Sequence, residues 1–211
     1  MDNSGYNYYE DTSLDEHHSF LLPKVLQILA NLNNDLKNNK SIFELGCGNG
    51  SVANLLTKNG WNVIGVDPSI KSIKLANKGF PNLKLYNGST EENLVEKYKQ
   101  FPVVLSLEVI EHIFDPYEFA KVTFDLLEPG GTLILSTPYH GYLKNLLLAL
   151  SGKMDEHYLP LWKNGHIKFW SINTLKKLLH ETGFKDMTFF RRGRIPPLAK
   201  SMIVQARKPK N

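Results

Sequence analysis

Two kinds of apolar pattern alternate along this chain. Short apolar runs, which are typical of buried strands, are separated by segments in which apolar residues recur every three or four positions, as on one face of a helix. Because strands alternate with helices, the pattern predicts a parallel sheet with right-handed crossovers. The expected strands cover residues 41–45, 62–66, 83–86, 103–106 and 132–137, and the helices between them cover about 50–59, 69–78 and 117–127.

Both ends of the chain depart from this alternation. Residues 15–36 read as a helix, with Pro23 expected near its true start. Residues 1–14 are polar and rich in tyrosine, so we expect residues 1–22 to form an arm or lid, with His17 and His18 either in solvent or over a ligand. Near the other end, a helix over 171–182 precedes two strands at about 185–191 and 200–207, which predict an antiparallel hairpin.

Residues 139–170 interrupt the strand–helix rhythm. In their first half, Leu143, Leu146, Leu147 and Leu150 recur as on one face of a helix, and their second half is rich in His, Lys, Tyr and Trp. This composition suits a cover over an aromatic or lipid-like substrate. The leucine face either packs on the core or makes a peripheral contact with a membrane or an apolar substrate tail. We expect a single domain over 1–211, with 139–170 as a substrate-cover insertion.

Composition and charge narrow the class of protein. The chain has 211 residues, 42% of them hydrophobic and 22% charged, as in soluble globular domains. It shows no signal-peptide pattern and no apolar run of membrane-spanning length, and its one cysteine cannot form an internal disulfide. These features predict a cytoplasmic protein. The net charge is +4, and basic residues cluster after Met187, where they form either a solvated strand and tail or a contact with nucleic acid or anionic lipid.

A glycine-rich turn after the first strand is the first candidate site. Residues 42–50 run from apolar positions into the pattern E-x-G-x-G-x-G, with Glu44 before the glycines. Glycine lets a ligand approach the backbone closely, and the following helix start offers free N–H groups. A nicotinamide-dinucleotide fingerprint requires a third glycine where Ser51 stands, and Glu44 suits a positively charged ligand better than a pyrophosphate.

Asp67 ends the second strand about 20 residues after the glycine turn, the place of the acid that binds ribose hydroxyls in Rossmann-like sheets. The combination resembles the class I S-adenosylmethionine (SAM)-dependent methyltransferases: Phe43 to Gly50 matches their first motif and Asp67 their second. The E-P-G-G-x-L-x-L-S-T-P stretch from Glu128 resembles their late motif. Ser89 stands where many of these proteins have an acid near the adenine.

This resemblance implies the whole fold and a set of SAM contacts. The fold is α/β, a Rossmann-like, mostly parallel seven-stranded sheet of order 3-2-1-4-5-7-6, with the last strand antiparallel and helices on both faces. Glu44 would contact the methionine moiety and Asp67 the ribose. The full set of implied cofactor contacts is Glu44, Gly46, Cys47, Gly48, Asp67, Pro68, Gly88, Ser89, Ser106, Leu107 and Glu108.

The second candidate site follows the fourth strand, where ligands bind in open α/β sheets. In a helical turn, Glu108, Glu111 and His112 would share one face, and two carboxylates with an imidazole can ligate a divalent metal. Alternatively, Glu108 caps local backbone N–H groups and Glu111 is solvated.

The stretch E-V-I-E-H-I-x-D-P from Glu108 resembles the ubiquinone-biosynthesis O-methyltransferases, as do residues 165–171, 193–194 and 200–203. The resemblance implies a Mg²⁺-type divalent cation. By a related pattern in small-RNA 2′-O-methyltransferases, the metal ligands would be Glu108, Glu111, His112 and His166. His140 and His157 remain competitors for the fourth place.

The implied reaction is in-line methyl transfer from SAM to an oxygen of a small-molecule substrate, an aromatic or quinone-precursor hydroxyl. A metal would lower the pKa of that hydroxyl. Without it, His112 or His166 would be the catalytic base. One alternative is RNA 2′-O-methylation, which the basic end and the metal motif suggest and the lack of an evident extra RNA-binding domain disfavours. The other is a non-catalytic SAM-binding module.

Overall fold

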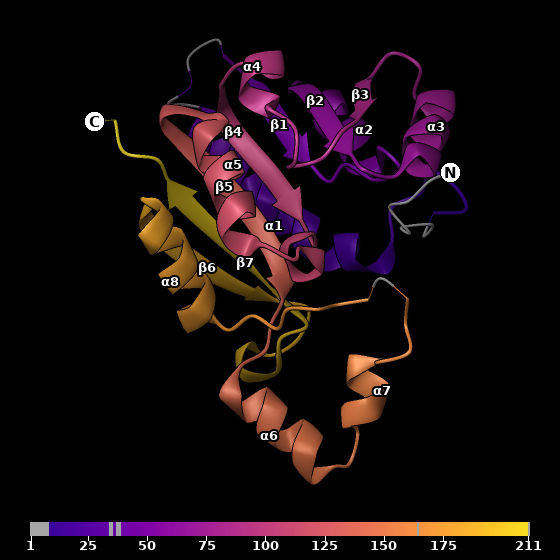
Figure 1. Ribbon diagram of the computed structural model, residues 1–211, viewed down its shortest axis with the longest axis vertical. Coiled ribbons are helices and arrows are strands. Elements are labelled where there is room, and N and C mark those ends of the chain that lie inside the picture. Colours follow the sequence, from indigo (N-terminus) through magenta and orange to yellow (C-terminus); the bar gives the residue numbers. More distant parts are fainter. Residues whose placement is uncertain (1–8, 34–35, 37–38, 164, 211) are drawn as a thin grey trace.

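The computed structural model of the protein describes residues 9–33, 36, 39–163 and 165–210. They form a central sheet between two layers of helices (Figure 1). The strand order is β3-β2-β1-β4-β5-β7-β6, and β7 runs antiparallel to both of its neighbours while the other pairs are parallel. The predicted Rossmann-like α/β fold is therefore confirmed, including its strand order and its antiparallel last strand.

The expected strands and the main helices all form. The strands are β1 (Ser41–Leu45), β2 (Asn62–Asp67), β3 (Lys84–Asn87), β4 (Phe101–Leu107), β5 (Leu127–Pro138), β6 (Lys185–Arg192) and β7 (Ser201–Arg207). The helices are α1 (Glu16–Asn33), α2 (Ser51–Lys58), α3 (Ile70–Gly79), α4 (Leu94–Tyr98), α5 (Pro116–Asp125), α6 (Tyr142–Leu150), α7 (Met154–Tyr158) and α8 (Ile172–Thr182), with 3₁₀ turns η1 (Ile110–His112) and η2 (Pro196–Leu198).

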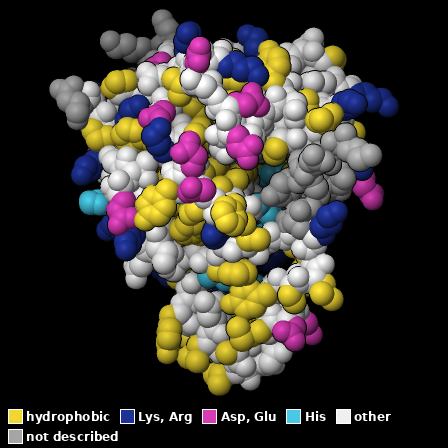
Figure 2. Space-filling view, in the orientation of Figure 1, with side chains coloured by type: hydrophobic (Ala, Val, Ile, Leu, Met, Phe, Trp, Pro, Cys, Tyr) yellow, Lys and Arg dark blue, Asp and Glu magenta, His cyan; other side chains and the backbone are white. Residues whose placement is uncertain are grey.

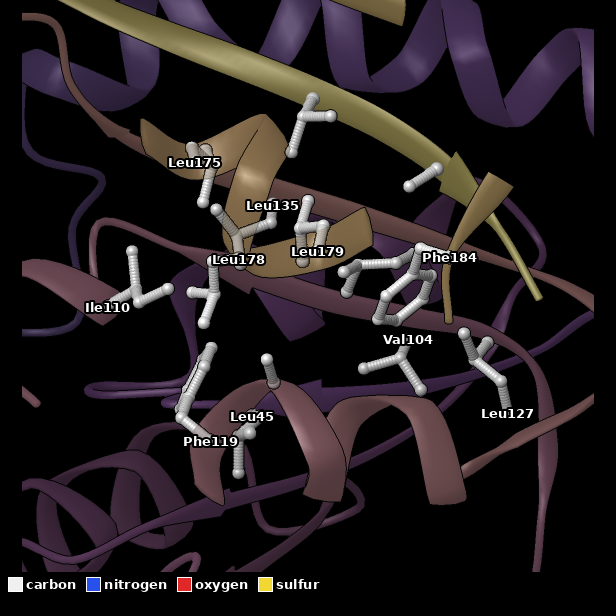
Figure 3. Close-up of a cluster of buried hydrophobic side chains, with 14 of the residues drawn as sticks. Leu45, Val104, Ile110, Phe119, Leu127, Leu135, Leu175, Leu178, Leu179 and Phe184 are labelled. Atoms are coloured by element: carbon white, nitrogen blue, oxygen red, sulfur yellow. The ribbon is translucent and has the colours of Figure 1, made fainter. Parts of the chain in front are cut away.

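Each face of the sheet buries its own hydrophobic core. Because successive side chains of a strand point to opposite faces, Phe43 of β1 packs with α4, α5 and α8 whereas Ile42 packs with α1, α2 and α3. Figure 3 shows the first core, in which Phe119 of α5 and Leu178 of α8 lie against the sheet. Both layers thus hold the carboxyl ends of β1, β2 and β4 in fixed positions.

Two predicted helix boundaries were wrong. The first helix begins at Glu16, so Pro23 lies inside α1 and not near its start, and the α-helix ends at Asn33. An interior proline removes one backbone hydrogen bond, but burial of Leu21 and Val25 against the sheet offsets that loss. The predicted helix over 117–127 ends earlier, because Leu127 already pairs with Phe101 as the first residue of β5.

Two further local features differ from the prediction. Helix α4 was not predicted because five residues are too few for an apolar period; the Asn93 side chain caps it by accepting from the Glu96 N–H. Residues 128–131, whose Pro-Gly-Gly sequence favours a turn, form an irregularity inside β5, where the pairing shifts from Leu127 opposite Phe101 to Thr132 opposite Val103.

The segment 139–170 leaves the sheet and returns beside its own start. Tyr139 forms a parallel bridge with Trp170, and the His140 N–H donates to the Trp170 carbonyl at 2.8 Å. Between these anchors lie α6 and α7, which form a lobe below the sheet (Figure 1). None of the α6 residues is buried, and hydrophobic side chains gather over this lobe in Figure 2. Within the described residues, no helix combines the length and the apolar character needed to cross a bilayer.

Candidate active site

The glycine turn after β1 is packed so tightly that side chains are excluded. Gly46, Gly48 and Gly50 have φ angles of 84°, 50° and 75°, in the region that favours glycine. A Cβ on Gly46 would collide with the Val109 side chain. The Gly46 and Cys47 N–H groups both donate to the Val66 carbonyl, at 2.8 and 3.0 Å, so the turn is fastened to β2.

Asp67 joins the glycine turn to the end of β2. Its Oδ2 atom accepts from the Gly48 N–H at 2.9 Å, and its Oδ1 atom accepts from the Ser69 N–H at 2.8 Å. The carboxylate therefore organises the turn from within and also lines the adjacent cavity. The sequence predicted a ribose contact for Asp67 but gave no sign of these backbone contacts.

Glu44 is a buried acid directly beneath the turn. It is 3% exposed, and among the described residues its Oε2 atom has no hydrogen-bond partner. Burial, followed by repulsion from Asp67, raises the pKa of Glu44 to about 8. A buried carboxyl oxygen without a partner costs free energy, and a positively charged ligand group is the chemistry that would compensate it.

A cavity, here called the strand-end cavity, opens where β1, β2 and β4 end. Of the predicted cofactor contacts, those that line it are Gly46, Asp67, Pro68, Gly88, Ser89, Leu107 and Glu108. Glu44, Cys47, Gly48 and Ser106 lie behind this lining: the Ser106 hydroxyl donates to the Leu45 carbonyl at 2.8 Å, and burial raises the pKa of the Cys47 thiol well above its usual range. A thiol held neutral in this way is a poor nucleophile.

Tyr9 also lines this cavity, and the sequence did not single it out. Its ring lies over the glycine turn, since a Cβ on Gly48 would come within 2.7 Å of it. Burial and the nearby carboxylates of Asp15 and Asp67 raise the pKa of the Tyr9 hydroxyl. The tyrosine-rich composition of the arm was the available signal. Tyr6 and Tyr8, in the predicted arm or lid over 1–22, lie outside the described residues.

Glu111, His112 and His166 form a compact group of potential metal ligands. Each offers one ligand atom, and these atoms all lie within 4.8 Å of one another. Glu111 is 1% exposed, which contradicts the alternative of a solvated side chain. Its Oε2 atom accepts from the Thr137 hydroxyl at 3.0 Å, whereas Oε1 has no partner among the described residues. Burial, followed by repulsion from Glu108, raises the pKa of Glu111 well above its usual range.

The return of the 139–170 segment brings His166 to this group. The Glu111 carbonyl accepts from the N–H groups of Ile167 and Lys168 at 2.9 and 3.0 Å. His112 Nδ1 donates to the Gly165 carbonyl at 3.2 Å. Because a carbonyl only accepts, this bond places the proton on Nδ1 and makes Nε2 the His112 nitrogen suited to bind a proton or a metal.

Glu108 points elsewhere, which corrects the expectation that it shares one helical face with Glu111 and His112. Its φ angle of 54° lies in the left-handed region, just before η1 begins. Its carboxylate accepts from the hydroxyls of Ser136 at 2.7 Å and Ser201 at 3.1 Å, and lies 3.7 Å from His17 Nδ1. The structure thus places Glu108 outside the group formed by Glu111, His112 and His166.

The other histidines have different environments. His140 and His157 pack against each other, with ring centroids 5.3 Å apart, and they do not belong to the Glu111 group. His18 is 8% exposed, so solvent exposure was wrong for it. His17 is exposed, but hydrogen bonding to Glu108 raises its pKa.

A second cavity, here called the basic cavity, adjoins the first across Glu108. It lies between α6, the start of α1 and the loop before β7, and its lining includes Lys144, Arg194 and His166. Its lining residues His17 and Ser201 contact Glu108, which lines the strand-end cavity. The Glu111 group therefore lies where the two cavities approach each other.

Comparison with known proteins agrees with this geometry. Residues 15–188 match a family described as methyltransferase domain. The ubiquinone biosynthesis O-methyltransferase of Ruegeria pomeroyi is 30% identical over 69% of this chain and 60% of its own length. The protein of the same name from Dinoroseobacter shibae is 30% identical over 76% of this chain and 68% of its own length. The chain thus spans 60% and 68% of these two relatives.

Solved structures show the same fold at lower identity. A SAM-dependent methyltransferase of Thermotoga maritima has a TM-score of 0.62 and 21% identity, covering 87% of this chain and 88% of its own. One from Archaeoglobus fulgidus has a TM-score of 0.61 and 16% identity, covering 87% and 94%. The match over residues 15–188 establishes that the chain belongs to the methyltransferase-domain family, and these structures share its fold.

Proposed function

We propose that this chain transfers the methyl group of SAM to a hydroxyl oxygen of a small aromatic or quinone-precursor molecule, with help from a divalent cation. The observation that carries the proposal is the group formed by Glu111, His112 and His166 at the junction of the two cavities. The O-methyltransferase names of the relatives support the choice of oxygen as acceptor.

The strand-end cavity has features that fit SAM. SAM supplies a methyl group on a positively charged sulfur, and it also carries an ammonium group. Glu44, with its unpartnered buried oxygen, is suited to compensate positive charge, and the glycine turn carries no side chains of its own at Gly46 and Gly48, beside which Tyr9 and Val109 pack. The residues that would hold the rest of the molecule are Asp67 and the 88–90 loop.

The donor atoms of the Glu111 group also fit a divalent cation. Glu111 Oε1 is buried without a partner, and two imidazoles with one carboxylate form a mixed nitrogen and oxygen donor set. Such a set suits Mn²⁺ or a similar transition metal better than Mg²⁺, which prefers oxygen ligands. A bound cation supplies positive charge that lowers the pKa of a nearby hydroxyl group.

His112 is the residue best placed to receive a proton. The Gly165 carbonyl holds the proton of His112 on Nδ1, so Nε2 is the atom that would ligate a cation. Without a cation, Nε2 can instead accept the proton that the substrate hydroxyl loses as the carbon–oxygen bond forms. With a cation held there, the acidified hydroxyl would lose that proton to solvent. The carbon–sulfur bond breaks in the same step, and the sulfur leaves as a neutral thioether. The remaining task of the protein is to align donor and acceptor, which can supply much of the rate enhancement.

A screen with isotope-labelled SAM tests the proposal. Catechols should acquire label, chelation should abolish the reaction, and added Mn²⁺ or Mg²⁺ should restore it. Calorimetry with Mn²⁺ provides a second readout, in which the wild type binds the ion and the Glu111→Gln variant does not. Full activity in excess chelator would refute the requirement for a divalent cation and leave His112 as the general base.

RNA is the alternative acceptor. The positive charge of Arg191, Arg192 and Arg194, at and after the end of β6, favours it. The same labelled-SAM assay with small RNAs as acceptor separates the two. Label in RNA but in no catechol would replace our proposal, and label in neither, with SAM bound, would favour a non-catalytic SAM-binding module.

A further inference from the structure

The basic cavity has an unusual balance of charge. Among its sixteen described lining residues, four are lysine or arginine, four are histidine, and one, Glu16, is acidic. Glu16 is engaged by Lys200, whose Nζ lies 2.6 Å from Oε1. The remaining lysines and the arginine lining the cavity are Lys144, Lys153 and Arg194.

Lys144 and Arg194 face the cavity without a neutralising partner. Lys144 Nζ donates to the Tyr139 carbonyl at 2.8 Å, an uncharged acceptor. Within the described part of the chain, no carboxylate lies within 4.0 Å of either cation, whereas five other lysine and histidine side chains and the Lys200 side chain form such pairs. Glu108 attracts Lys144 only over a longer distance.

The two cations act on one another and on their neighbours. Burial, followed by repulsion from Arg194, lowers the pKa of Lys144 to about 8. Burial, followed by repulsion from Lys144, lowers the pKa of His157 as well. Like charges in a partly buried site destabilise each other. In the free protein Lys144 and Arg194 therefore repel each other, and a bound anion would offset that repulsion.

Lys144 and Arg194 line the same cavity as part of the Glu111 group. The same cavity is lined by His166 of the Glu111 group and by the apolar side chains of Phe169, Leu147 and Leu198. A molecule bound here therefore meets apolar side chains, two unneutralised cations and His166 of the Glu111 group. This combination fits an aromatic ring that carries both an acidic group and a hydroxyl.

We propose that the methyl acceptor carries an anionic group, a carboxylate or a phosphate, which Lys144 and Arg194 bind in the basic cavity. Arginine can bind either group through two parallel hydrogen bonds, and lysine adds a point charge. The inference rests on the proposed function, since it describes the acceptor of that reaction, but the binding of the anion can be measured without methyl transfer.

The first experiment compares three matched probes, which are phenol, benzoate and phenyl phosphate, by NMR chemical-shift titration of the whole protein. We expect at least one anion to bind about tenfold or more tightly than phenol. Lys144→Met and Arg194→Met should each remove that preference, while Lys176→Met, an exposed position on α8, should keep it. The affinity for S-adenosylhomocysteine should stay unchanged in all three variants, which shows that the fold is intact.

The results separate the two anions and the two proposals. Tighter binding of benzoate identifies a carboxylate as the anionic group, and tighter binding of phenyl phosphate identifies a phosphate. Equal binding of phenol and both anions, or a preference that survives in Lys144→Met and Arg194→Met, overturns the anionic acceptor. In the labelled-SAM assay, methylation of catechol with no gain for 3,4-dihydroxybenzoate or a catechol phosphate also overturns it and leaves O-methylation standing. Anion binding at Lys144 and Arg194 without any methylation supports the site and refutes the proposed reaction.

Discussion

The two cavities differ in charge and in the way the chain builds them. The strand-end cavity is lined by the carboxylates of Asp67 and Glu108, with Glu44 buried behind it, and no lysine or arginine is among its described lining residues. The basic cavity is lined by Lys144, Arg194 and their neighbours. A positively charged methyl donor and a negatively charged acceptor would each meet the opposite charge, so electrostatics alone would keep the two substrates in their own places.

The difference in construction is equally instructive. Residues at the ends of β1, β2 and β4 line the strand-end cavity, and both hydrophobic cores hold these strands. The basic cavity combines the start of α1, the 139–170 lobe and the loop before β7, and many of its residues are exposed. We therefore expect the donor side to tolerate few substitutions, and the acceptor side to change specificity without loss of the fold.

The largest expected effect comes from the junction of the cavities. Glu111→Gln keeps the shape of the side chain but removes its charge, so we expect kcat to fall at least about a hundredfold. The affinity for SAM should change little, because Glu111 does not line the strand-end cavity. Steady-state kinetics and calorimetry measure the two effects, with Glu118→Gln, exposed on α5, as the matched control. Retained activity would remove Glu111 from the mechanism.

A smaller loss is expected on the donor side alone. Asp67→Ala leaves the Gly48 and Ser69 N–H groups without their acceptor and removes a polar contact from the cavity wall. We expect the binding of S-adenosylhomocysteine to weaken by about 1–3 kcal/mol. Calorimetry checks this, with Asp125→Ala, at an exposed ion pair on α5, as control. Unchanged affinity would mean that Asp67 organises nothing that the ligand contacts.

The pH dependence of ligand binding should also distinguish the two cavities, because Glu44 lies behind the strand-end cavity. Its pKa rises from 4.5 to about 8 on folding, so between these values the folded carboxyl keeps a proton that the unfolded chain has released. The free energy of unfolding should therefore fall as pH rises through this window. A cationic ligand favours the ionised form, so SAM binding should release a proton and tighten with pH, by at most about tenfold per unit.

Calorimetry between pH 6 and 7.5, in buffers of different ionisation enthalpy, measures this proton release. Glu44→Gln should abolish it, since an amide does not titrate in this range. If the variant releases as many protons as the wild type, Glu44 does not face the positive charge of the ligand.

The smallest effect on stability is expected at the lobe. Leu146 and Leu150 on α6 are 38% and 74% exposed, whereas Leu175 on α8 is fully buried. Leu146→Glu with Leu150→Glu should change the free energy of unfolding by less than about 0.5 kcal/mol. Leu175→Ala should cost about 2–5 kcal/mol. Denaturant unfolding measures both.

The same double variant tests the proposed peripheral membrane contact. The exposed leucines of α6 could insert at a bilayer surface, so the wild type should sediment with anionic liposomes and the double variant should not. No difference between them would assign the apolar face of α6 to some other role.

Local pattern and motif resemblance were enough to predict most of the fold and the position of the strand-end cavity. Alternating strands and helices predicted the strands of the sheet, and the resemblance to class I methyltransferases implied their order. The glycines at 46, 48 and 50 with Asp67 marked the strand ends where the strand-end cavity opens, because such signals depend on neighbours in sequence or on strand ends that a parallel sheet aligns. Helix α4 was not predicted because five residues show no period. Helix α1 was predicted, but Pro23 lies inside it and not near its start, because burial against the sheet offsets the cost of an interior proline.

Only the tertiary structure decided how the Glu111 group and the basic cavity are assembled. Spacing placed Glu108 with Glu111 and His112, but a left-handed backbone turns Glu108 toward Ser136, Ser201 and His17. His166 reaches Glu111 because the 139–170 segment folds back on itself, and Lys144 of α6 lines the same cavity as Arg194 of the loop before β7. Such contacts join residues far apart in the chain, and their energies depend on burial and charge in three dimensions, which no local pattern records.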